Sequence, residues 1–269
     1  MKKMLMNQGS TGGLSGMGLD EAGLERKNPV IVALGDSVTA GHFEMTLPAD
    51  AEGQKAFMGK FFGRKLYTPE ELAAMTVEEL KEIRRPALEI TDARESYVEK
   101  FRMKLIDKYE FTSVSVINAG VAGDVLPSMA ARAERDVIRY QPDLVLINGS
   151  LNWNPSLGTA EEYKEILRAL VQRIKAETEA DIVLLTPNGD LPNTFFGGAS
   201  APEPTTPERV AKIRELAVEE QVCLADTYAV WEAAREAGVP WVELLANGVN
   251  HPGVEGHEVY AITLMKLFE

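Results

Sequence analysis

The stretch "VIVALGDSVTAGHFE", residues 30 to 44, contains an apolar run that ends abruptly at Gly35-Asp36-Ser37. A short run of Val, Ile, Ala and Leu that is bounded by glycine is typical of a strand buried on both faces of a sheet. The serine that follows the run has two interpretations. It lies either in a structural turn or at the edge of the sheet as a nucleophile, and the rest of the sequence bears on this choice.

Four further apolar runs share the features of the first, because they are short, rich in Val, Ile and Leu, and bounded by Gly, Pro, Asn or Asp. They lie at residues 114–118, 144–148, 182–186 and 222–225. Helical patterns alternate with them at residues 94–109, 126–140, 159–178 and 205–220. In the third of these, Thr159 and Glu162 predict a capping box. This alternation predicts an α/β fold with a parallel sheet between two layers of helices, and a ligand site outside the carboxyl ends of the strands.

The chain divides into an N-terminal arm and one domain. Residues 1–28 are rich in Gly, Ser and Met and lack periodicity, which indicates a flexible arm, and residues 29–269 form the domain. Within the domain, residues 44–94 interrupt the alternation, and Thr68, Pro69 and Glu71 mark a helix start there. We interpret this segment as a helical, cap-like insertion over or beside the site. The alternative is a surface decoration.

The composition limits the partners of the chain. Of its 269 residues, 41 are Asp or Glu and 28 are Lys or Arg, which gives a net charge of −13 and argues against nucleic acid or an anionic membrane surface. No apolar stretch is long enough to span a membrane, and no apolar core follows the N-terminal lysines, so we expect a cytoplasmic protein. The single cysteine, Cys223, excludes an intramolecular disulfide, and its apolar surroundings predict a buried, unreactive thiol.

Three polar segments follow later apolar runs and are expected at the same edge of the sheet as Ser37. They are "INAGVAGD" (117–124), "LINGSLNWN" (146–154) and "NGVNHPGVEGHEVYA" (247–261). Hydrolysis of an ester needs a nucleophile, a base that takes its proton, and donors where negative charge develops. Ser37 offers the hydroxyl, and His251 is a residue type that accepts and returns a proton near neutral pH. The convergence favours the nucleophile over the turn.

Four motifs in this order resemble those of the SGNH (GDSL-type) hydrolase superfamily, over roughly residues 29 to 269. They are "GDSVTAG", "NAGVAGD", "GSLNWN" and "NHPGVEGH". The resemblance implies a flavodoxin-like, three-layer α/β/α sandwich with five mostly parallel strands. It also implies Ser37 as nucleophile, His251 as base, and an oxyanion hole formed by Ser37 N–H, Gly123 N–H and the Asn152 side chain. It implies no cofactor and no metal.

For other residues in or near these motifs, a structural role competes with a role in catalysis. Asp36 either supports the nucleophile loop, as the resemblance implies, or caps a local turn. Gly123 also suits a backbone position with positive φ, which does not exclude the oxyanion role. His42 is close to Ser37 in sequence and can line the pocket without taking part in catalysis. His257 is more typical of a packing or helix-surface residue, and the three histidines show no metal-ligand spacing.

The sequence departs from the family pattern at two places. The family has an aspartate three or four residues before the catalytic histidine, where this chain has Gly248 or Asn247. In the third motif, Ser150 replaces a glycine and Trp153 replaces an aspartate when the segment is aligned without gaps. The nucleophile, base and donors are therefore present, whereas the acid that orients the histidine is absent from its expected place.

Three explanations of the missing acid remain open. His251 acts in a Ser–His dyad with a backbone carbonyl, or Glu243 or Glu255 supplies the carboxylate, or the chain binds its ligand without turning it over. We expect a serine esterase that acts on short-chain acyl esters, and family analogy favours an acetylated carbohydrate. A lysophospholipase or thioesterase is the alternative enzyme, and a ligand-binding relative is the alternative outside enzymes. The expected partner is a small-molecule or carbohydrate ester, and the sequence does not predict the oligomeric state.

Overall fold

The computed structural model describes residues 28–45, 74–76, 79, 89–109, 113–192 and 203–269. The predicted flexible arm therefore lies outside the described residues, except for Asn28, and so does most of the predicted insertion at 44–94. None of the helices in the described ranges combines the length and the apolar content that crossing a membrane requires.

The core of the protein is a five-stranded sheet in which every neighbouring pair is parallel. Its strands are β1 (Val30–Gly35), β4 (Ser115–Gly120), β5 (Leu144–Asn148), β6 (Asp181–Leu185) and β7 (Cys223–Ala225). Their order across the sheet is β4-β1-β5-β6-β7. Counted along the chain, this order is 2-1-3-4-5, the flavodoxin-like arrangement. The predicted fold class is confirmed.

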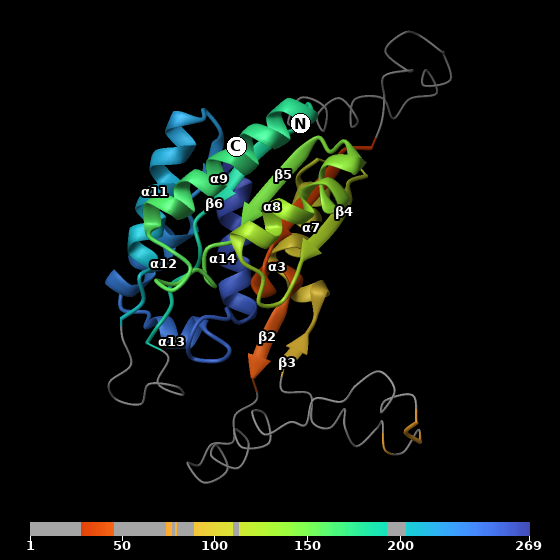
Figure 1. Cartoon of the computed structure of the whole chain (residues 1–269). Helices are drawn as coiled ribbons and strands as arrows, with labels where there is room; N and C mark the ends of the chain where they lie inside the picture. The colour runs from red at the N-terminus through yellow and green to blue at the C-terminus, as the bar shows by residue number, and fades with distance from the viewer. Residues whose placement is uncertain (1–27, 46–73, 77–78, 80–88, 110–112, 193–202) are drawn as a thin grey trace.

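Helices cover both faces of the sheet (Figure 1). One face carries α8 (Leu126–Asp136), α9 (Ala160–Glu177) and α11 (Thr206–Glu219), and the other carries α7 (Tyr97–Lys108) and α14 (Val254–Met265). Successive side chains of a strand point to opposite faces, so Val32 and Leu34 of β1 pack in the first layer while Ile31 and Ala33 pack in the second. The shorter elements are α3 (Ser37–Ala40), α12 (Thr227–Glu236), α13 (Trp241–Leu244) and 3₁₀ turns at Ala93–Glu95, Ile138–Tyr140 and Lys266–Phe268.

Burial on both faces holds for the central strands but not for the edges. Every residue of β5 is buried, whereas the residues of β4 are all exposed or half-buried and β7 has one buried residue, Ala225. The prediction of five strands buried on both faces was therefore wrong for β4 and β7. It was also wrong for Cys223, which is exposed because it begins an edge strand. Local composition does not distinguish an edge strand from a central one.

The two ends of the predicted insertion are extended rather than helical. β2 (His42–Met45) and β3 (Glu89–Thr91) pair in antiparallel fashion and form a separate two-stranded sheet. Figure 1 shows this ribbon projecting from the end of the molecule where β1 stops. The helix predicted to start at Thr68 begins outside the described residues. Further along the predicted helix, residues 74–76 are not helical. Thr76 and Glu79 exchange capping hydrogen bonds there, which is typical of the start of a helix.

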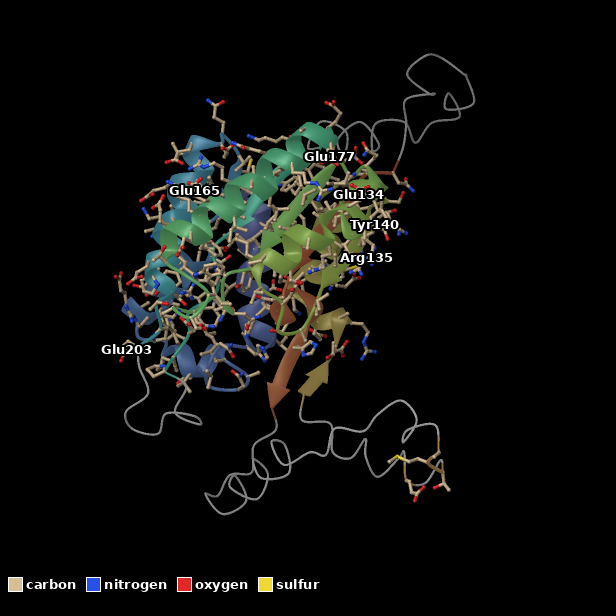
Figure 2. The ribbon with its side chains drawn as sticks, in the orientation of Figure 1. Glu134, Arg135, Tyr140, Glu165, Glu177 and Glu203 are labelled. Atoms are coloured by element: carbon tan, nitrogen blue, oxygen red, sulfur yellow. The ribbon has the colours of Figure 1, made fainter. Side chains whose placement is uncertain are left out.

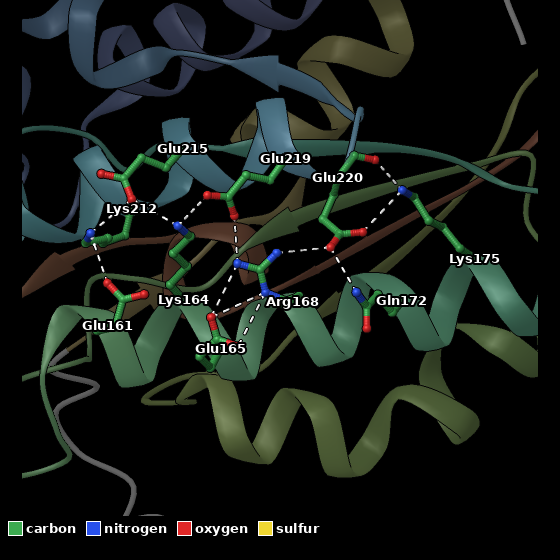
Figure 3. A network of polar contacts seen from close by, with 10 residues as sticks. All are labelled: Glu161, Lys164, Glu165, Arg168, Gln172, Lys175, Lys212, Glu215, Glu219 and Glu220. Atoms are coloured by element: carbon green, nitrogen blue, oxygen red, sulfur yellow. Dashed lines mark hydrogen bonds and ion pairs between the residues drawn. The ribbon is translucent and has the colours of Figure 1, made fainter.

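Ion pairs fasten α11 to α9 (Figure 3). The predicted capping box of Thr159 and Glu162 is present at the start of α9. Further along, Lys164 contacts Glu215 at 3.0 Å and Glu219 at 2.8 Å, and Arg168 contacts Glu219 at 2.6 Å. This network fixes the side-by-side packing of the two helices, and with it the positions of the residues at their N-terminal ends.

Candidate active site

Ser37 and His251 meet at the carboxyl ends of the strands. They are 214 positions apart in the sequence, and Ser37 Oγ lies 2.9 Å from His251 Nε2. Both side chains are buried, with 6% and 8% of their surface exposed. Since a serine hydroxyl and a neutral imidazole nitrogen form a donor–acceptor pair, the contact suits transfer of the serine proton to the histidine. For this transfer Nε2 must carry the lone pair and Nδ1 the hydrogen.

The loop around Ser37 is built by close backbone packing. Asp36 is the N-cap of α3, and its Oδ1 accepts the Val38 backbone N–H at 3.0 Å. Gly35 has no room for a side chain, because a Cβ there would lie 2.0 Å from Thr39 Oγ1 and 2.6 Å from the Asn148 carbonyl oxygen. Gly41 ends the short helix with a φ of 88°. These contacts make a sharp strand-to-helix turn that presents Ser37 at the sheet edge.

Asp36 is a fully buried carboxyl group with an unusual titration. Burial, together with the nearby charge of Asp124, raises the pKa of Asp36 from 3.8 to about 7. Its Oδ2 has no hydrogen-bond partner among the described residues. Asp36 therefore caps the local turn, which is one of the two roles that the sequence suggested for it.

Two asparagines support the loop that carries His251. The Asn247 Oδ1 accepts the backbone N–H groups of Val249, Asn250 and His251 at 2.9–3.0 Å. From the other side, Asn188 Nδ2 donates to the Asn250 carbonyl oxygen at 2.9 Å. The Asn188 side chain is itself held by Tyr260, whose hydroxyl donates to Asn188 Oδ1. The histidine is thus anchored to two elements besides its own loop.

Gly123 and Asn152 lie in two loops that are joined to each other. Gly123 has a φ of 71°, and an added Cβ would meet no atom within 4 Å, so the backbone conformation rather than crowding favours glycine there. One residue on, the Asp124 carbonyl oxygen accepts the Asn152 side-chain amide at 2.9 Å. Because an amide nitrogen carries two hydrogens, this bond orients Asn152 and leaves a second N–H for a ligand.

Arg132 connects these loops to the nucleophile strand. From α8 it donates to the Asp124 carboxylate at 2.7 Å, to the Gly35 carbonyl oxygen at 2.9 Å and to the Ala119 carbonyl oxygen at 2.8 Å. Gly35 directly precedes Asp36-Ser37, and Asp124 holds Asn152. Arg132 therefore ties the ends of β1 and β4 to the loop after β4, and the Asn152–Asp124 bond adds the loop after β5.

The other two histidines have different surroundings. The half-buried His42 ring lies edge-on to the His251 ring, with 6.3 Å between their centroids. His257 is fully buried, and its Nδ1 accepts the Tyr97 backbone N–H at the start of α7 at 3.1 Å. Burial lowers the pKa of His257 to about 3, so it is neutral at physiological pH. The interpretation of His257 as a packing residue is confirmed.

Known proteins are similar to this chain in sequence and in fold. A model of the GDSL-like lipase/acylhydrolase family matches residues 87–259, which is more than half of the sequence. This chain is a member of that family. An acetylxylan esterase of Geobacillus stearothermophilus is 28% identical over 171 residues, which span 59% of this chain and 74% of the relative.

Two solved structures illustrate the shared fold. A protein of Parabacteroides merdae, described as a GDSL-like lipase, superposes with a TM-score of 0.60 and 22% identity over 89% of this chain and 95% of its own. The acetylxylan esterase of Geobacillus stearothermophilus superposes with a TM-score of 0.59 and 22% identity over 89% and 94%. At this identity the two structures establish the fold alone.

The family match includes Gly123, Asn152 and His251 but begins after the "GDS" stretch. Membership in the GDSL family therefore does not by itself identify the nucleophile of this chain. The 2.9 Å contact with His251 is the independent observation that points to Ser37.

The expected acid positions are occupied by structural residues. Asn247 organises the His251 loop through backbone contacts, and Gly248 has a φ of 66°. The side chains of Glu243 and Glu255, the two remote alternatives, are exposed. In the third motif, the Trp153 ring is buried and its Nε1 donates to the Gly158 carbonyl oxygen at 3.1 Å. The tryptophan shapes the loop rather than supplying charge.

Sequence reasoning missed Arg132, Asn188 and Tyr260. Asn188 had a signal, because it follows β6 at the edge of the sheet that carries Ser37. Arg132 and Tyr260 had none, since each lies inside a helical pattern where an arginine or a tyrosine is ordinary. Among the described residues, no three His, Cys, Asp or Glu side chains gather in a way that would hold a metal ion.

Proposed function

We propose that this chain is a serine esterase that hydrolyses short-chain acyl esters, with an acetylated carbohydrate as the substrate class. The observation that carries the proposal is the buried contact between Ser37 Oγ and His251 Nε2 at the carboxyl edge of a GDSL-family sheet. The similarity to an acetylxylan esterase supports an acetylated carbohydrate as the substrate class.

In the proposed reaction, His251 takes the Ser37 proton while Oγ attacks the ester carbonyl carbon. The Ser37 N–H, the Gly123 N–H and the free N–H of Asn152 stabilise the negative oxygen that forms. His251 then gives its proton to the leaving alcohol, which leaves an acyl group on Ser37. Water attacks this acyl-serine with His251 again as the base, and the carboxylic acid and free serine result.

Asn247, at one of the positions where the family has an acid, supports the backbone of the loop that carries His251. Its side chain fixes the backbone at three consecutive residues up to His251, and Asn188 holds the same loop from β6. The geometry of a Ser–His dyad can therefore be maintained by neutral hydrogen bonds.

A panel of p-nitrophenyl esters from acetate to palmitate tests the reaction class. We expect the highest kcat/KM for acetate or another short chain, and activity that depends on Ser37. A preference for long chains would favour the lysophospholipase alternative. Ester binding without turnover would show a ligand-binding relative and contradict the proposal.

Asn152→Ala is expected to lower kcat by about 10²–10³ with little change in KM, because the lost N–H acts in the transition state. Steady-state kinetics on p-nitrophenyl acetate measures both constants. Gln172→Ala is the control, since that exposed amide of α9 bonds Glu220 and lines neither the site nor its cavities. A folded Asn152→Ala enzyme with unchanged kcat would remove Asn152 from the oxyanion hole.

Arg132→Gln is expected to lower kcat by about ten- to a hundredfold, since small displacements of reacting groups have effects of this size. KM should change less, because Arg132 positions the loops and does not contact substrate. Arg135→Gln on the same helix is the matched control: its exposed side chain (Figure 2) bonds Asp136 and no other side chain among the described residues. Equal kinetics of the two variants would show that the hydrogen bonds of Arg132 serve stability alone.

A further inference from the structure

A cavity opens next to the loops that carry Asn152 and His251. Its volume is about 370 Å³, and its walls come from the loop after β5, the segment after β6 and the loop before α14. Residues that line it include Leu151, Trp153, Asp190, Arg209, Val249 and Asn250. A second cavity of about 390 Å³ has Trp153 and Arg209 in its lining as well, so the two cavities adjoin. This space has the size of a small-ligand site.

Arg209 is the buried cation of this space. Only 3% of its surface is exposed, and it donates to the Ser150 carbonyl oxygen at 3.0 Å and to the hydroxyls of Thr205 and Thr206 at 2.7 Å. All three acceptors are uncharged, and no carboxylate of the described residues forms an ion pair with it. A guanidinium has five N–H groups, so these bonds leave donors available. Burial lowers the pKa of Arg209, and the nearby charge of Asp190 opposes this effect without direct contact between the two side chains.

Asp190 supplies the complementary acceptor. Its Oδ2 accepts the Thr206 hydroxyl at 2.8 Å, so Thr206 lies between the carboxylate and Arg209. Burial raises the pKa of Asp190 above its usual range. Arg209 belongs to α11 and Trp153 precedes α9, the two helices that the ion pairs of Figure 3 join. Donors, acceptors and apolar surface thus occur together in a rigid frame.

The charge of the lining argues against an anionic ligand. Asp190 and Glu203 line the first cavity and Glu162 and Glu208 line the second, whereas Arg209 is the one cation among the described residues of either lining. A uronate or phosphate group would meet this excess of carboxylates. Hydroxyl groups, in contrast, can donate to Asp190 and accept from Arg209.

We propose that this cavity is the subsite for an uncharged sugar ring of the substrate, with Arg209 and Asp190 binding its hydroxyl groups. This inference rests on the proposed esterase function, and it adds where the sugar binds and that the bound ring is uncharged. In this assignment Arg209 and Asp190 select the sugar, whereas Ser37 and His251 carry out the reaction.

Binding measurements on the Ser37→Ala protein test the subsite independently of turnover. We expect calorimetry to detect xylotriose, and to show at least tenfold weaker binding of xylotriose that carries a glucuronate branch. Adding Asp190→Asn should weaken xylotriose binding by about tenfold, and adding Arg209→Gln should weaken it by at least as much. Arg214→Gln is the control, because this arginine of α11 pairs with Asp226 outside the cavity.

Asp190→Asn keeps the shape of the side chain and is the decisive variant if Arg209→Gln fails to fold.

Kinetics separates failure of the subsite from failure of the proposed function. In the Ser37 enzyme, Asp190→Asn should raise KM for acetylated xylotriose, with a loss of kcat/KM at least tenfold larger than for p-nitrophenyl acetate. Equal losses on both substrates, unchanged xylotriose binding, or tighter binding of the glucuronate-bearing sugar would each overturn the subsite. A wild-type protein that hydrolyses no ester would overturn the esterase function, while the calorimetry would still decide whether the cavity binds sugar.

Discussion

Ser37→Ala is expected to abolish ester hydrolysis, with a fall in kcat of about 10⁴-fold or more. Loss of a serine nucleophile removes the covalent pathway, and only binding and oxyanion stabilisation remain. The size of the effect follows from the position of Ser37, whose hydroxyl is the group in contact with His251 Nε2. Initial rates on the best ester of the panel, measured for wild type and variant at equal concentration, give the ratio.

Covalent labelling identifies the residue directly. A fluorophosphonate probe should modify wild type once, and peptide mapping should place the adduct within residues 35–41, while Ser37→Ala remains unlabelled. Ser156→Ala is the control, since this exposed serine lies in the loop before α9. Stoichiometric labelling at another residue, with Ser37 unmodified, would refute the assignment.

Asp36→Asn is expected to stabilise the protein at pH 8 and to leave its stability nearly unchanged at pH 4. The folded state holds the Asp36 proton up to a pKa of about 7, whereas 3.8 is the ordinary value. Because the folded state raises the pKa of Asp36, the protonated carboxyl costs nothing below about pH 4. The free energy of unfolding then falls as pH rises, until Asp36 is ionised in the folded state above about pH 7. The neutral amide avoids this loss, which amounts to about 4 kcal/mol at most.

Thermal and urea unfolding of wild type and Asp36→Asn at pH 4, 6 and 8 measure the effect. The difference in free energy of unfolding should grow with pH, because asparagine can still cap Val38 through Oδ1. Asp107→Asn removes a charge from an exposed site on α7 and is the control. A difference that is constant from pH 4 to 8 would show that Asp36 has an ordinary pKa in the folded protein.

Local signals in the sequence predict most of the architecture. Residues 144–148 coincide with β5, and Thr159 and Glu162 form the predicted capping box, because such features depend on neighbours within a few positions. Features that depend on the place of a segment in the sheet were not predictable in this way. Cys223 is exposed only because β7 is an edge strand, and β2 and β3 are strands only because they pair with each other across the insertion.

The candidate site shows the same division. By itself, the sequence determined which residue types follow the strands, and hence Ser37, Gly123, Asn152 and His251 as candidates for ester chemistry. The tertiary structure alone decided that Ser37 Oγ lies 2.9 Å from His251 Nε2, and that Arg132 joins the ends of β1 and β4 to the loop after β4. The physical reason is that these contacts join residues up to 214 positions apart, and packing of the whole fold, which no local pattern encodes, brings them together.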